Sequence, residues 1–237
     1  MEAFEGRQEE NGCFPALLSG FLLVGGLSTL MVEGVGPTCK ACGEAKNACA
    51  EDRLLADFYR KVIERYAEQI SFGEEKSVVE LKKLVEPSPK VVEASEKISG
   101  AEGVAEDFPS YALNCLDFLK GIALISSGLK FSFWLKPGEV LELCAGDSMD
   151  KALLLCSLLS ARGSSTASVR VVELEDGVKH ALVCFEHSGT AYVLDASASS
   201  SWSGPSVEEV LSQVLVGGKK VLKSLYEFNS ESYSSFQ

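Results

Sequence analysis

Three side chains in the second half of the chain have the types and the order of a nucleophile, a base and an orienting acid. Ser148 follows a tight turn at Gly146-Asp147 and begins an apolar run that predicts a helix. His180 and Asp195 follow in two segments that predict successive strands. The helix dipole stabilises the anion of a nucleophile at a helix N-terminus, and such a nucleophile needs a base held by a third group. The order suggests a catalytic triad.

Short, β-branched segments must position the imidazole and the carboxylate. The predicted strands span 167–174, 178–186 and 191–196, with glycine-containing turns between them. An antiparallel meander places the last two strands side by side, so a His180–Asp195 pair is expected. Helical periodicity is present before and after the meander, at 49–72, 77–86, 91–98, 109–126 and 206–215. Helices followed by a meander, with the nucleophile helix packed on it, predict an α+β fold.

Changes in composition divide the chain into four parts. We expect a hydrophobic, cysteine-containing segment at 1–50 and a helical region at 51–100. A polar, glycine-containing joint at 99–107 separates this region from the domain that carries the triad, at 101–229. The serine-rich end, 230–237, is expected to be frayed.

Four short motifs in the second half resemble one family. They are Phe133-Trp134-Leu135-Lys136-Pro137-Gly138-Glu139, Gly146-Asp147-Ser148-Met149-Asp150, His180-Ala181 and Leu194-Asp195-Ala196-Ser197. In this order they resemble the transglutaminase-like superfamily, in its microbial form with a papain-related core. The resemblance covers about 131–197 and implies a nucleophile helix packed on a small antiparallel sheet, amide-bond chemistry on a peptide or protein, and no cofactor.

The resemblance implies a role for five residues. Ser148, His180 and Asp195 stand at the catalytic positions of the family. Trp134 and Asp147 are candidates for substrate binding. The alternative for Trp134 is packing beside the site, and for Asp147 it is a charge at a helix terminus.

Three positions depart from the family pattern. The family has its nucleophilic cysteine at position 148, a tryptophan at Leu182 and a proline at Ala196. A serine hydroxyl is far less ionised than a thiol, so simple replacement should cost several orders of magnitude in rate. Ser148 is therefore a nucleophile in a rewired triad, a helix-cap serine in a dead site, or an engineered replacement of cysteine.

These alternatives leave three functions open. The first is a silent or weak transglutaminase-like domain that acts as a binding or structural module. The second is an active peptidase or amidase that uses Ser148, His180 and Asp195. The third is a scaffold or assembly protein anchored by residues 12–32.

The N-terminal segment 12–32 has no charged residue over a length close to that of a membrane-spanning helix. The preceding ten residues contain four glutamates and one arginine, which is unlike a secretory signal. A membrane anchor, a buried element and an assembly contact all fit this segment. Localisation therefore stays open, with membrane association through 12–32 as one alternative.

Net charge and cysteine spacing argue against nucleic-acid binding and against a zinc site. A formal charge of −12 without a basic patch argues against nucleic-acid binding. Cys39, Cys42 and Cys49 lack the second pair that a zinc site requires, so no metal is expected. Four further cysteines lie in apolar runs and are expected to be small buried residues: Cys115, Cys144, Cys156 and Cys184.

Overall fold

The computed structural model describes residues 46–99, 107–125 and 133–236, with the backbone alone for 46–52. The segment 12–32 and the Cys39-x-x-Cys42 pair lie outside the described residues. The chain divides into two compact units, and α1 (Lys46–Arg65) and α2 (Ala67–Gly73) are the described part of one of them. The sequence predicts one helix at 49–72, but the structure has two, because the backbone of Tyr66 leaves the α-helical region.

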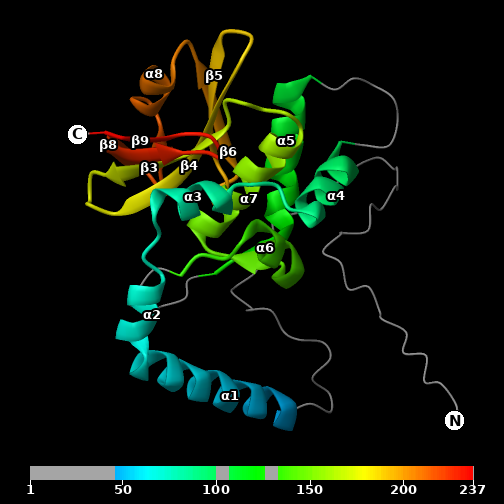
Figure 1. The fold of residues 1–237 in the computed structure, drawn as a ribbon, viewed down its shortest axis with the longest axis vertical. Coiled ribbons are helices and arrows are strands. Elements are labelled where there is room, and N and C mark those ends of the chain that lie inside the picture. The colour runs from blue at the N-terminus through cyan, green and yellow to red at the C-terminus, as the bar shows by residue number, and fades with distance from the viewer. Residues whose placement is uncertain (1–45, 100–106, 126–132, 237) are drawn as a thin grey trace, which may run out of the picture. The chain divides into compact units, whose positions relative to one another are not determined.

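The larger unit confirms the predicted α+β class, with helices before an antiparallel sheet. In the described residues the sheet has seven strands, in the order β6-β5-β4-β3-β8-β7, with β9 paired to β8 (Figure 1). The strands are β3 (Ser168–Leu174), β4 (Lys179–His187), β5 (Thr190–Asp195), β6 (Ser200–Gly204), β7 (Leu215–Val216), β8 (Lys219–Phe228) and β9 (Tyr233–Ser235). β3, β4 and β5 form the predicted meander.

The C-terminal part differs most from the prediction. The expected helix 206–215 is only α8 (Val207–Leu211), and Gly217 and Gly218 take positive φ values of 57° and 81° between β7 and β8. The frayed tail expected at 230–237 is wrong over 233–235, where β9 pairs with β8. The centroids of the stacked Tyr226 and Tyr233 rings are 6.1 Å apart. Pairing with β8 thus orders a serine-rich segment whose own sequence does not favour a strand.

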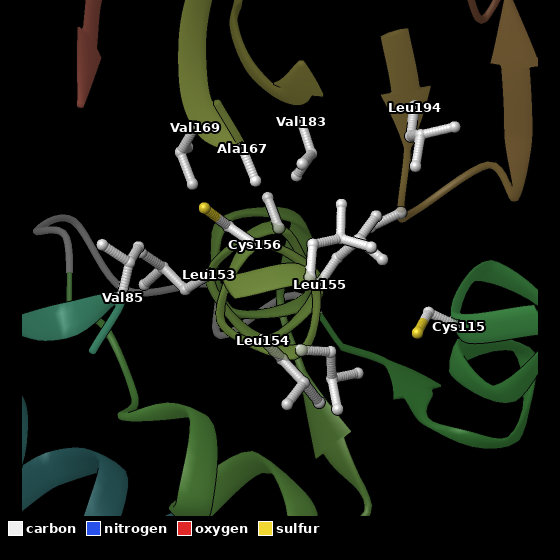
Figure 2. Packing of buried hydrophobic residues seen from close by; sticks show 14 of the residues in the cluster. Val85, Cys115, Leu153, Leu154, Leu155, Cys156, Ala167, Val169, Val183 and Leu194 are labelled. Atoms are coloured by element: carbon white, nitrogen blue, oxygen red, sulfur yellow. The ribbon is translucent and has the colours of Figure 1, made fainter. Parts of the chain in front are cut away.

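Helix α7 (Ser148–Ala161) lies at the centre of the larger core. Every residue from Asp150 to Leu159 is buried. Figure 2 looks along α7 and shows Cys156 pointing toward Ala167 and Val169 of the sheet side, while Leu154 points away from them. A helix that is apolar all round must be covered all round. The sheet covers it together with α4 (Pro89–Ile98), α5 (Phe108–Phe118) and α6 (Pro137–Leu143), and α3 (Val78–Leu84) adds two leucines to the same cluster (Figure 1).

The helix expected at 109–126 ends early. α5 stops at Phe118, a 3₁₀ turn (η1, Leu119–Gly121) follows, and β1 (Ala123–Leu124) pairs in parallel with β2 (Ala145–Gly146). The backbone N–H of Ala123 donates to the Cys144 carbonyl at 2.9 Å. This pairing fixes the chain just before Ser148.

The two faces of the sheet carry separate apolar clusters. Alternate residues of β4 belong to different clusters, because successive strand residues point to opposite faces. Ala181 and Val183 join the cluster that contains α7. Leu182 and Cys184 join the cluster that contains α8 (Figure 1).

Candidate active site

The N-terminus of α7 is closed by a capping box that leaves Ser148 out. The Asp147 carboxylate accepts a hydrogen bond from the backbone N–H of Asp150 at 2.9 Å, and Asp150 accepts one from the N–H of Asp147 at 2.9 Å. Ser148 is the half-buried first residue of the helix. Asp147 and not Ser148 is therefore the cap of α7, so a capping role does not account for the serine.

Close packing holds the turn before Ser148. A Cβ on Gly146 would lie 2.8 Å from the Cβ of Asp150, so this position requires glycine. The second carboxylate oxygen of Asp150 accepts the backbone N–H of Leu135 at 2.7 Å. Asp150 thus joins the start of α7 to the segment that contains Trp134, which is partly buried against the core. The D-x-x-D spacing is the sequence signal for this role.

His180 and Asp195 form a hydrogen-bonded pair at neighbouring ends of β4 and β5. His180 Nε2 lies 2.9 Å from Asp195 Oδ2. The side chain of Asp195 is completely buried, whereas that of His180 keeps 11% of its surface exposed. The predicted antiparallel pairing of the two strands, with Val183 opposite Leu194, brings them together.

Several donors keep Asp195 ionised despite its burial. Burial by itself would raise its pKa, but hydrogen bonds from His180 and Ser197 and the His180 charge hold the pKa of Asp195 below its ordinary value. Its Oδ1 accepts the N–H and the hydroxyl of Ser197 and the N–H of Ala198, at 2.9, 2.6 and 3.0 Å. An ionised carboxylate only accepts, so it favours the proton on Nε2 of His180. Nδ1 then carries the lone pair that a base needs.

Lys151 is a buried charged residue that sequence reasoning missed. It lies on α7 with 3% of its surface exposed, and its Nζ donates to the Ile122 carbonyl at 3.2 Å. Burial lowers the pKa of Lys151, although the charge of Asp195 acts in the opposite direction. A lysine just before an uninterrupted apolar run is the only local signal for this burial.

Asp150 provides a pH-dependent prediction. Burial raises its pKa to about 6, against the effect of hydrogen bonds from the Asp147 and Leu135 backbone. Between about pH 4 and pH 6 the native state therefore holds a proton that the unfolded chain has lost, and this carboxyl makes stability fall as pH rises through that window. We expect a carboxyl ¹³C NMR titration, assigned with Asp150→Asn, to show a midpoint near 6.

Asp176 is the matched control for that titration. Its hydrogen bond with Lys219 holds its pKa below the ordinary value. The Asp176 carboxyl should therefore titrate well below Asp150 in the same spectra. Midpoints that coincide would contradict the burial argument.

The described cysteines fall into two groups. Cys115, Cys156 and Cys184 are buried, as predicted. Cys144 is half-buried and disulfide-bonded, so the prediction of a small buried thiol is wrong for it. Within 46–99, 107–125 and 133–236 there is no cluster of three or more metal-ligand side chains. No helix in the described part of the chain is long and apolar enough to cross a membrane.

Comparison with known proteins finds structural similarity to Legionella pneumophila LapG. The EGTA-treated form of that protein matches with a TM-score of 0.45 and 14% identity, over 63% of this chain and 87% of that chain. The calcium-bound form matches with a TM-score of 0.45 and 15% identity, over 61% and 87%. No family model matches the sequence, and no curated protein does. The similarity concerns the fold.

Proposed function

We propose that the chain carries an acyl-transfer site for amide bonds of peptides or proteins, of the transglutaminase-like type with a papain-related core. Ser148 is the nucleophile, His180 transfers protons, and Asp195 orients His180. The hydrogen bond between His180 and the completely buried Asp195 carries the proposal. Burying a carboxylate costs free energy, so a buried Asp195 that bonds a histidine favours a functional role. Because the bond uses Nε2 of His180, Nδ1 stays available for proton transfer.

The start of α7 supplies the remaining chemistry. The Ser148 Oγ attacks the amide carbonyl, and the backbone N–H of Ser148 at the positive end of α7 stabilises the oxyanion. The amine leaves, and water hydrolyses the acyl-enzyme. Trp134 and Asp147 both precede Ser148 in sequence, and Asp150 joins the segment that contains Trp134 to the start of α7. We assign both residues to the substrate side of the site.

A silent binding module is the second candidate function. It is favoured by Ser148 itself, because the motifs around it resemble those of enzymes that use a thiol. In that case the His180–Asp195 pair is retained without a competent nucleophile. A scaffold role through 12–32 concerns residues outside the described part of the chain.

A paired labelling experiment tests the proposal. The full chain is treated with a fluorophosphonate probe, with Ser148→Ala as control, and Ser148→Cys is treated with an iodoacetamide probe, with and without His180→Ala. We expect Ser148-dependent labelling of the unmodified chain. Thiol labelling of the Ser148→Cys variant alone would support a silent module, and no labelling in either chain would leave a binding or structural role.

A further inference from the structure

The buried lysine lies one helical turn from the nucleophile. Residues three apart on a helix are neighbours, and side chains on a helix lean toward its N-terminus. Ser148 and Lys151 therefore share one side of the first turn of α7. The spacing Ser-x-x-Lys at a helix start is the one that serine β-lactamases and penicillin-binding proteins use.

Backbone contacts place the Lys151 amine beside the turn that leads into Ser148. Its Nζ donates to the carbonyl of Ile122, directly before β1. β1 in turn bonds the turn, since the N–H of Ala123 donates to the Cys144 carbonyl and the N–H of Ile125 donates to the Gly146 carbonyl, both at 2.9 Å. The amine is thus held at the strand pair that immediately precedes the nucleophile.

The Lys151 amine is buried without a carboxylate bonded to it in the described residues. A buried ammonium is costly without a bonded carboxylate, and none lies within ion-pair distance of its Nζ in the described residues. Its hydrogen bond to Ile122 uses one N–H, which a neutral amine can also donate. Burial favours the neutral form, and the nearby Asp195 charge opposes this effect without reversing it.

We propose that Lys151 is the general base that activates Ser148. This inference rests on the proposed function and assigns its acylation step. The amine takes the Ser148 Oγ proton as the bond from Oγ to the acyl carbon forms, and the ammonium returns a proton to the departing nitrogen as the C–N bond breaks. In deacylation His180 Nδ1 takes a proton from water, the hydroxide attacks, and Ser148 Oγ recovers that proton on leaving.

A lysine base explains how a serine nucleophile can act in a site whose motifs resemble those of cysteine enzymes. An amine is a stronger base than an imidazole, by several pKa units in reference peptides, and a hydroxyl needs a stronger base than a thiol. A thiol at position 148 would need only the imidazole. Lys151 is therefore required for serine and dispensable for cysteine.

The test compares Lys151 substitutions in two nucleophile backgrounds. With Ser148 present, we expect Lys151→Met to slow fluorophosphonate labelling by at least about 100-fold, and Lys151→Arg to do the same because arginine stays protonated. With Ser148→Cys, iodoacetamide labelling should change less than about threefold when Lys151 is replaced, because His180 serves the thiol. Lys120→Met, on the surface of the same unit, is the control and should change neither rate.

The outcomes separate the inference from the proposed function. Equal slowing of serine and cysteine labelling by Lys151→Met would show a structural role and overturn the inference. Undiminished serine labelling in Lys151→Met would overturn the inference alone, whereas no labelling of the unmodified chain overturns the proposed function with it. Lys151→Gln, which keeps a donor for the Ile122 carbonyl, replaces the Lys151→Met variant if that variant fails to fold.

Discussion

Asp195→Asn is expected to lower amide hydrolysis by about 10³- to 10⁴-fold while leaving the fold intact. The amide oxygen of the introduced asparagine can still accept the hydrogen bonds that Ser197 and Ala198 donate to Oδ1. Its NH₂ group then faces His180 Nε2, which must become an acceptor. The imidazole proton moves to Nδ1, so the nitrogen needed for proton transfer loses its lone pair.

Two measurements check this expectation. Turnover is followed with fluorogenic peptide amides, and the tautomer of His180 is followed by ¹⁵N NMR of the imidazole, which is one of two in the chain. Asp117→Asn, at an exposed ion pair with Lys120, is the matched control. A His180 tautomer that is unchanged in Asp195→Asn, or turnover within tenfold of the unmodified chain, would contradict the assigned role of Asp195.

The meander that holds His180 and Asp195 could be predicted because its signals are local. Gly177 and Gly189 take positive φ values of 80° and 78° at the two hairpins, and the strands that they join contain valines and aromatic residues that favour strands. β8 has no such signal. Its first half carries Lys219, Lys220 and Lys223, and its register against β3 shifts between Val171 and Val172, which breaks simple alternation.

The details of the candidate site depended on contacts that sequence spacing does not specify. Asp147 and Ser148 are both good cap residues, and the extended backbone of Asp147 (φ −82°, ψ −173°) decides between them. A lysine is usually on the surface, but Lys151 reaches a carbonyl 29 positions earlier in the chain. That contact exists only because the predicted helix 109–126 ends at Phe118, so that Ile122 lies directly before β1.

On the opposite face of the sheet from α7, Arg170→Met is expected to destabilise the protein by about 3 kcal/mol. Arg170 is almost completely buried on β3 and joins three elements. It bonds Glu227 of β8, with an Nε–Oε2 distance of 2.7 Å, and Glu208 of α8 at 3.0 Å. Because only 22% of the Glu227 side chain is exposed, removal of the arginine leaves a poorly hydrated carboxylate without its cation.

A double variant tests whether the unpaired Glu227 charge causes the loss of stability. Arg170→Met with Glu227→Leu removes both charges, and we expect most of the lost stability to return, since replacing a whole buried ion pair by apolar residues is close to neutral. Lys97→Met removes an exposed ion pair with Glu93 and should cost less than about 1 kcal/mol. The free energies of unfolding come from urea titrations at pH 7. A double variant as unstable as Arg170→Met would show that lost packing, including the Arg170 contact with the Phe236 ring, outweighs the unpaired charge.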